Sequence, residues 1–440
     1  MNTLLLSTCL LLADYRDFFP RPQISGPEEV YASDDDRFLI HYTREGDDAV
    51  LGDGTPDAVS WVLEGLELGA ETNAERGYRP LRLDSGEGGS NAIDVYLTYE
   101  RGNGTMHTTE PEEDSPGFSC FVTVSPDLQT FGREVMMSVA IHELHHCIQY
   151  TYTNGVDGWF LESAATYEQY RTLLNDELNL AVGVLYAVRL LQPERPIHEK
   201  DSRWEYAGFI FAKFLEEFDG PATRLPDFYE ALREEGPDWR TTFDVESQRV
   251  WGMDFEEVFL NHATWNAFAC ALDDGQHYGN EVLPCWTEAK VPITTVEDST
   301  FEVIHEQATH TALYFSIPAD GDSRPIGLEC DGPGVDARSL VNLVALDQDG
   351  IAGEEVSTLG WDNHPTASQL TQPLDGNGSV LAVFASTGEI GAHQECRVIR
   401  HEIEASSSSP SSCGCTSTRF GGTGFMLLPL VVAYRRNRRS

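Results

Sequence analysis

The pentapeptide His-Glu-Leu-His-His at residues 142–146 constrains this chain more than any other feature. It lies in a segment, Gly132 to Tyr152, in which apolar residues recur at helical spacing. On a helix, residues i and i+4 lie about 40° apart around the axis and one turn along it, so the rings of His142 and His146 can reach one metal ion. Glu143 lies about 100° further round, where it can accept a proton from a metal-bound water. The spacing therefore predicts a catalytic metal site on this helix.

The rest of the segment indicates which way these side chains point. His142 and His146 continue a row that begins with Val135 and Val139, so we expect both rings to face inward. Two polar rings on an apolar stripe are costly to bury without partners, which favours a bound ion over histidines that share this spacing by chance. His145 lies off the row, and we expect it to support a ligand or lie at the surface rather than bind the metal.

A zinc site of this kind needs a third protein ligand and an open fourth position. After the turn signal at residues 154–158, residues 159–168 predict a second helix that carries two carboxylates. Glu162 lies in its first turn, and the small residues at 163–165 would let the helix pack closely on the histidine helix. Glu168 projects from a different side. We expect Glu162 to be the ligand, with Glu168 as the alternative.

Here the sequence resembles the gluzincin metallopeptidases, in which a Glu-x-x-Ala on a downstream helix supplies the third ligand; Glu162 and Ala165 match it. Segments that resemble the strands and helices of a gluzincin domain follow in the same order, at residues 38–42, 57–70, 93–97, 120–124, 204–211 and 254–265. The resemblance implies an α+β fold and a zinc metallopeptidase that holds one Zn²⁺ per chain. Its ligands would be His142, His146 and Glu162.

The same resemblance implies a mechanism. Zinc would lower the pKa of its bound water to about 7, and Glu143 would accept the proton and pass it to the leaving amine. A tyrosine or histidine from the downstream part would donate to the oxyanion, and Tyr206 is the candidate. The alternative is that Tyr206, near Phe209 and Phe211, is a core residue. The substrate would be a peptide or protein, with exo- or endopeptidase activity left open.

The two ends of the chain predict export. Residues 4–12 are an apolar run that ends at Ala13, so residues 1–13 read as a signal peptide, although basic residues before the run are absent. After a Ser/Pro-rich linker, the tail carries a Cys-Gly-Cys motif at 413–415, ten apolar residues at 425–434 and a basic terminus.

This tail resembles the C-terminal sorting tags of myxobacterial and related secreted proteins. Its apolar run is too short to span a bilayer comfortably, which takes about 20 residues, but a short membrane anchor is the alternative. In either case the tail, residues 405–440, would engage a membrane or sorting machinery. The catalytic part would then lie at the cell surface or outer envelope, or be secreted.

The cysteines agree with export. Without Cys9 and the two in the tail, six remain, an even number that predicts disulfides over buried thiols. From loop length and position we expect the pairs Cys120–Cys147, Cys270–Cys285 and Cys330–Cys396.

Net charge limits the possible partners of the chain, and hydrophobic periodicity predicts the fold of its C-terminal part. With 72 acidic and 29 basic residues, the net charge is −43, which excludes nucleic acid as a partner and suits a soluble secreted protein, whether or not its habitat is salty. Beyond Val291, alternating apolar runs at 311–317, 340–346 and 379–385 predict a β-sandwich. We therefore expect a metallopeptidase domain at 14–290 and a sandwich at 291–404.

Three further properties are only weakly constrained by the sequence. The acidic turns at 320–322 and 347–350 give weak support for structural Ca²⁺. Nothing indicates the oligomeric state. The main rival to an enzyme is an inactive surface binding or adhesion protein with a metallopeptidase-like fold, and the retained Glu143 argues against it.

Overall fold

The computed structural model describes residues 20–400, with internal gaps of which the longest are 108–116, 279–287, 332–338 and 370–376. The predicted signal peptide at 1–13 and tail at 405–440 lie outside the described residues. The chain divides into two compact units, Met1–Glu402 and Ile403–Ser440, and the described residues all belong to the first. Among the described helices, none is both long enough and apolar enough to cross a membrane.

The N-terminal part is a five-stranded mixed sheet in the order β1-β2-β3-β5-β4. Its strands are β1 (Glu28–Ala32), β2 (Phe38–Thr43), β3 (Ile93–Leu97), β4 (Gly104–His107) and β5 (Cys120–Val124). The central strands β2, β3 and β5 run parallel, and the edge strands β1 and β4 pair antiparallel with their neighbours.

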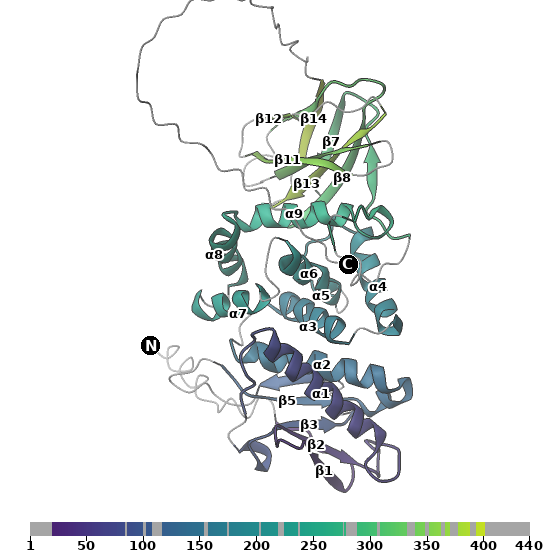
Figure 1. The fold of residues 1–440 in the computed structure, drawn as a ribbon, viewed down its shortest axis with the longest axis vertical. Helices are drawn as coiled ribbons and strands as arrows, with labels where there is room; N and C mark the ends of the chain where they lie inside the picture. The colour runs from purple at the N-terminus through teal and green to yellow at the C-terminus, as the bar shows by residue number, and fades with distance from the viewer. Residues whose placement is uncertain are drawn as a thin grey trace, which may run out of the picture. The chain divides into compact units, whose positions relative to one another are not determined.

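Two helices cover one face of this sheet side by side, α1 (Asp57–Glu75) and α2 (Arg133–Tyr150) (Figure 1). Gly65 of α1 allows their close approach, because a Cβ there would lie 2.7 Å from the carbonyl oxygen of Met137 in α2. The helix predicted around the pentapeptide is therefore confirmed, and it packs on the sheet through Met136, Ala140 and Leu144.

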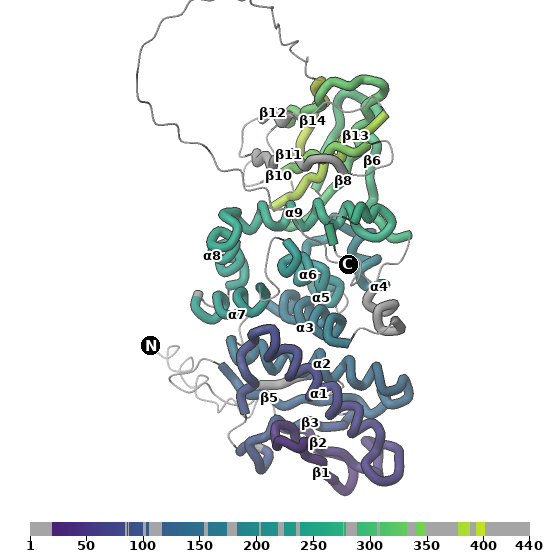
Figure 2. The backbone as a smooth tube through the Cα atoms, viewed as in Figure 1, coloured from purple at the N-terminus to yellow at the C-terminus, as the bar shows by residue number. Residues whose placement is uncertain are grey.

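A run of helices follows, which the backbone trace shows between the two β-rich parts (Figure 2). They are α3 (Gly158–Thr172), α4 (Asp176–Leu191), α5 (Trp204–Ala207), α6 (Phe209–Glu217), α7 (Arg224–Glu235), α8 (Trp239–Trp251) and α9 (Phe255–Ala267). The single helix expected over residues 204–211 is instead two short ones that meet at Gly208. A Cβ at position 208 would overlap the Ser163 hydroxyl, so glycine lets this segment lie against α3.

The C-terminal part is a β-sandwich, which confirms that prediction and the α+β class. One sheet has the order β11-β10-β13-β8-β6 and the other β12-β9-β14-β7. The strands are β6 (Ile293–Thr295), β7 (Thr300–Ile304), β8 (Thr311–Pro318), β9 (Ile326–Cys330), β10 (Ser339–Leu346), β11 (Ala352–Trp361), β12 (Thr366–Gln369), β13 (Ser379–Ser386) and β14 (His393–Arg400). Side chains from both sheets, among them Leu328 and Phe384, form the core between them.

The strand β13 is apolar on both faces for a reason that the sequence pattern alone does not supply. Val380, Ala382 and Phe384 point into the sandwich core, whereas the alternate residues Leu381 and Val383 join the core that the helices form. The helix α9 packs on this second face, and the predicted domain boundary at residue 290 stays a prediction.

Two of the three expected disulfides are present among the described residues. Cys120–Cys147 joins β5 to the last turn of α2, and Cys330–Cys396 joins β9 to β14 within one sheet. Cys270 is also disulfide-bonded. Its expected partner, Cys285, lies outside the described residues.

Candidate metal centre

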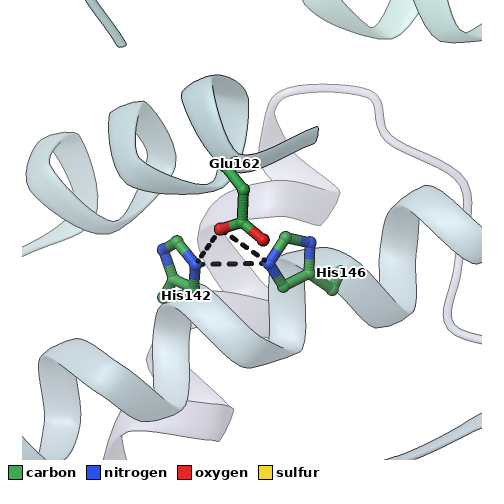
Figure 3. Close-up of side chains that lie close together, drawn as sticks. All are labelled: His142, His146 and Glu162. Carbon is green, nitrogen blue, oxygen red and sulfur yellow. Dashed lines mark hydrogen bonds and ion pairs between the residues drawn. The ribbon is translucent and has the colours of Figure 1, made fainter. Parts of the chain in front are cut away.

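Three side chains from two helices converge on one point (Figure 3). His142 and His146 rise from α2, and Glu162 descends from α3 just after its first turn, not within it as predicted, because the helix begins at Gly158. The carboxylate oxygen Oε2 of Glu162 lies 3.1 Å from Nε2 of His142 and 3.5 Å from Nε2 of His146. The two Nε2 atoms are 3.2 Å apart, and all the candidate ligand atoms lie within 4.8 Å of one another.

One glutamine contacts each imidazole on the side away from Glu162. Oε1 of Gln169 lies 3.1 Å from Nδ1 of His142, and Oε1 of Gln149 lies 2.7 Å from Nδ1 of His146. Gln149 has its oxygen on the histidine because its Nε2 donates to the Leu161 carbonyl at 2.9 Å. Each amide oxygen can only accept, so each neutral ring carries its proton on Nδ1 and presents a lone pair at Nε2.

The arrangement therefore gathers acceptors at its centre, between the two imidazoles and the carboxylate. Two imidazole lone pairs and one carboxylate oxygen face one another in a largely buried site, which is stable only with a cation or protons among them. The charges on the site reflect this. Burial lowers the pKa of His146 and its contacts with Glu162 raise it, to about 9. Burial raises the pKa of Glu162 and both histidines lower it, so that the carboxyl pKa is well below its usual range.

Glu143 and Tyr206 border the same point. Both line two adjoining pockets, of about 420 Å³ and about 240 Å³, that share His142 and Asn103. The ring centroid of Tyr206 lies 5.8 Å from that of His142. Burial and the nearby carboxylates of Glu162 and Glu143 raise the pKa of Tyr206, so its hydroxyl keeps a proton to donate.

Both histidine rings are buried, as predicted, but the apolar row before them lies at the edge of the core. Val135 and Val139 are half-buried, and Val139 lines the larger pocket beside His142. The core face of α2 is instead the Met136, Ala140 and Leu144 side. Val139 of this row thus borders the pocket rather than the centre of the core.

Glu168, the alternative ligand, is engaged elsewhere. It is fully buried, forms an ion pair with Arg76 and accepts a hydrogen bond from the Tyr78 hydroxyl at 2.8 Å. Arg76 also pairs with Glu216 of α6, so this cluster ties together α1, α3 and α6. The structure brings Glu162, and not Glu168, to the histidines.

His145 is likewise explained without a metal. It is a core residue and not a surface one, with its Nδ1 3.0 Å from the Asn73 side chain of α1 and its ring edge-on to Tyr78. Burial lowers its pKa well below the ordinary value, so the ring is neutral.

The sequence reasoning missed Gln149, Gln169 and Asn103. A signal existed for the two glutamines, because Gln149 lies three residues after His146 on α2 and Gln169 lies two turns after Glu162 on α3, each on its ligand's face. Asn103 lies in a loop just before β4, and no pattern marks it.

The acidic turn at 320–322 is not arranged for calcium. Asp322 accepts from the Arg324 guanidinium at 2.8 Å and lies 3.6 Å from Arg400. Positions 348–350 of the other turn lie outside the described residues. Among the described residues, His142, His146 and Glu162 are the group of acidic, histidine or cysteine side chains that could hold a metal ion.

Comparison with known proteins adds distant likenesses. No protein-family model matches the sequence, and no curated protein matches it. Legionella pneumophila aminopeptidase A, solved with aspartic acid, matches 80% of this chain and 36% of its own, at 12% identity and a TM-score of 0.37.

Two small structures match shorter stretches. The pre-peptidase C-terminal domain of a Bacillus anthracis collagenase matches 24% of this chain and 95% of its own, at 9% identity and a TM-score of 0.19. The Yersinia pseudotuberculosis-derived mitogen matches 26% of this chain and 96% of its own, at 10% identity and a TM-score of 0.19. These scores are too low to carry an argument about function.

Proposed function

We propose that this chain is a zinc-dependent peptidase whose metal is held by His142, His146 and Glu162. The observation that carries the proposal is the convergence of two Nε2 lone pairs and a carboxylate, each ring held from behind by an amide oxygen. Imidazole nitrogen and carboxylate oxygen are the donor set that suits Zn²⁺, and three protein ligands leave a position open for chemistry. When bound, zinc supplies a Lewis acid that activates water and polarises a carbonyl.

The remaining steps belong to side chains of this chain. Glu143 accepts a proton from the attacking water and returns it to the leaving amine, since its carboxylate borders both pockets beside His142. Tyr206 donates a hydrogen bond to the oxygen of the tetrahedral intermediate, because its hydroxyl keeps its proton and lies on the same cleft.

The shape of the cleft supports a peptide or protein substrate. The larger pocket lies beside Glu143 and has an apolar wall of Val139, Leu173 and Leu185, which suits an apolar side chain next to the cleaved bond. The two disulfides support an oxidising, extracellular setting. Export by the residues at 1–13 and surface retention by those at 405–440 complete the proposal.

The test is Glu143→Gln. The amide cannot accept a proton, so cleavage of the best substrate in a random peptide library should fall about 100- to 10,000-fold while bound zinc, measured by elemental analysis, stays at one per chain. Full activity in this variant would exclude Glu143 as the base. A wild-type protein that binds zinc but cleaves nothing would instead favour the inactive surface-binding protein.

A further inference from the structure

A second feature lies away from the metal centre, near the C-terminal end of α4. Arg189 is 6% exposed, and its guanidinium stacks on the Trp204 ring at 4.4 Å. Among the described residues it has no carboxylate partner, and its Nη1 has no acceptor. The carboxylate of Glu199, whose charge reaches it, is already bonded to Arg195 at 3.0 Å. A buried cation without an anion is strongly unfavourable, so the site is electrostatically incomplete.

The charge on Arg189 persists at neutral pH. Burial lowers the pKa of its guanidinium to about 9, with the positive charge of Arg195 acting in the same direction, and this value still leaves it protonated. The cation therefore has to be balanced by something other than loss of its proton.

A second buried donor without an acceptor, on His262, lines the same small cavity as Arg189. His262 of α9 is buried, and the Asn266 amide donates to its Nε2 at 3.2 Å. The amide is held in that orientation because its oxygen accepts from the hydroxyls of Tyr186 and Tyr278, both at 3.1 Å. The His262 proton must then be on Nδ1, and Nδ1 has no partner among the described residues.

These two side chains border one small cavity. It has a volume of about 20 Å³, and its other walls include Leu190, Phe259 and Tyr314. That space holds one guest about the size of a water molecule. The Tyr314 hydroxyl is already committed to the Ala263 carbonyl at 2.9 Å. A positive charge and a neutral N–H, with no acceptor of their own, call for a guest that only accepts.

We propose that Arg189 and His262 bind one small monovalent anion, such as chloride, in this cavity. A water molecule would satisfy the hydrogen bonds but leave the charge of Arg189 unbalanced. An anion does both. The site is independent of the metal centre and of the proposed peptidase activity.

The test has to separate binding from general screening, because any salt will stabilise a chain with a net charge of −43. We compare the thermal midpoint of the full chain in sodium chloride and in sodium gluconate at equal ionic strength, since gluconate is too large for the cavity. The wild-type midpoint should rise by roughly 2 °C for each tenfold increase in chloride above the dissociation constant, relative to gluconate. Equal midpoints in the two salts would overturn the proposal and leave water as the guest.

Variants then locate the site. Arg189→Met keeps the length of the side chain without its charge and should abolish the difference between the two salts. It should fold, because removal of an unpaired buried charge is not destabilising. Arg195→Gln is the matched control, since Arg195 stacks on the same Trp204 ring at 4.1 Å but has its own carboxylates, and it should keep the chloride response.

A chloride response that persists in Arg189→Met would place the anion elsewhere and contradict the proposal. If that variant does not fold, His262→Phe serves in its place. Phenylalanine keeps a ring in the aromatic surroundings and removes the N–H, so the apparent chloride affinity should fall at least tenfold. An unchanged affinity there would also overturn the assignment.

Discussion

Two carboxylates on one helix have opposite roles in this molecule. Glu162, just after the first turn of α3, faces two histidine nitrogens at the edge of a pocket, and its side chain is 27% exposed. Glu168 is fully buried on another face and meets Arg76 and Tyr78. Arginine brings a permanent cation, and because Arg171 also pairs with Glu216, the Glu168 cluster holds two arginines against two carboxylates. The histidines bring lone pairs when they are neutral, so the Glu162 cluster is balanced only by an added proton or a bound cation.

The largest expected effect separates these two residues at the metal. Glu162→Ala should lower zinc affinity by well over about 100-fold and abolish activity, because the carboxylate is a ligand, whereas Glu168→Ala should keep its zinc. Competitive titration with a fluorescent chelator measures both variants. The reverse order of affinities would transfer the ligand role to Glu168.

A variant of Tyr206 tests whether the site around Glu162 performs catalysis as well as binding a metal. Tyr206→Phe should lower kcat by about 100- to 1,000-fold and leave KM and zinc content nearly unchanged, because only the oxyanion donor is lost. Steady-state kinetics on the best library peptide decide it. A change confined to the melting temperature would show that Tyr206 has a structural role and no catalytic one.

The complementary effect belongs to Glu168. Glu168→Ala should cost about 3 kcal/mol in the free energy of unfolding, because Arg76 loses one of its two buried carboxylates. Urea denaturation measures it, with zinc content as the control. Because an apolar pair can replace a buried ion pair, Arg76→Met with Glu168→Leu should recover much of the loss. No recovery would mean that the cluster does more than balance charge.

The smallest expected effect belongs to the two glutamines that contact the histidine ligands. Gln149→Leu and Gln169→Leu should each lower zinc affinity by about 10- to 100-fold, because the imidazoles lose the acceptors that fix their Nδ1 protons. Gln149→Glu should be no better than the leucine variant, since a carboxylate cannot donate to the Leu161 carbonyl. The same chelator titration applies. Affinities that do not change would show that packing alone orients the rings.

The features that the sequence predicted correctly are those that depend on the spacing of residues within one helix or strand. The pitch of a helix places His142 and His146 on one face, and the alternation at 340–346 marks a strand. The helix expected over residues 254–265 is present as α9, and it begins with a capping box in which Asp254 and Glu257 each accept from the other's backbone at 2.9 Å. Glu162 needed one further assumption, that α3 turns back onto α2.

What failed depended on contacts between distant segments. The break at Gly208 arises from its approach to Ser163, some 45 residues earlier, and no helix propensity encodes it. The small residue Ser163, expected to admit α2, instead admits α5 through a bond to the Glu205 carbonyl at 2.8 Å. The partners of Arg76 likewise follow from tertiary packing alone, as does the lack of a carboxylate partner for Arg189 among the described residues.

The disulfide Cys120–Cys147 makes the candidate metal centre depend on the redox conditions around the chain. Cys147 is the residue directly after His146, and the bond closes a 27-residue loop that contains both histidines. Closing a loop of that length removes about 3.5 kcal/mol of unfolded-state entropy. In a reducing cytoplasm the segment bearing the ligands would lack this restraint. Under the proposed function, the chain would gain its full affinity for zinc only after the disulfide forms during export, and the proteins of the producing cell would be protected from cleavage until then.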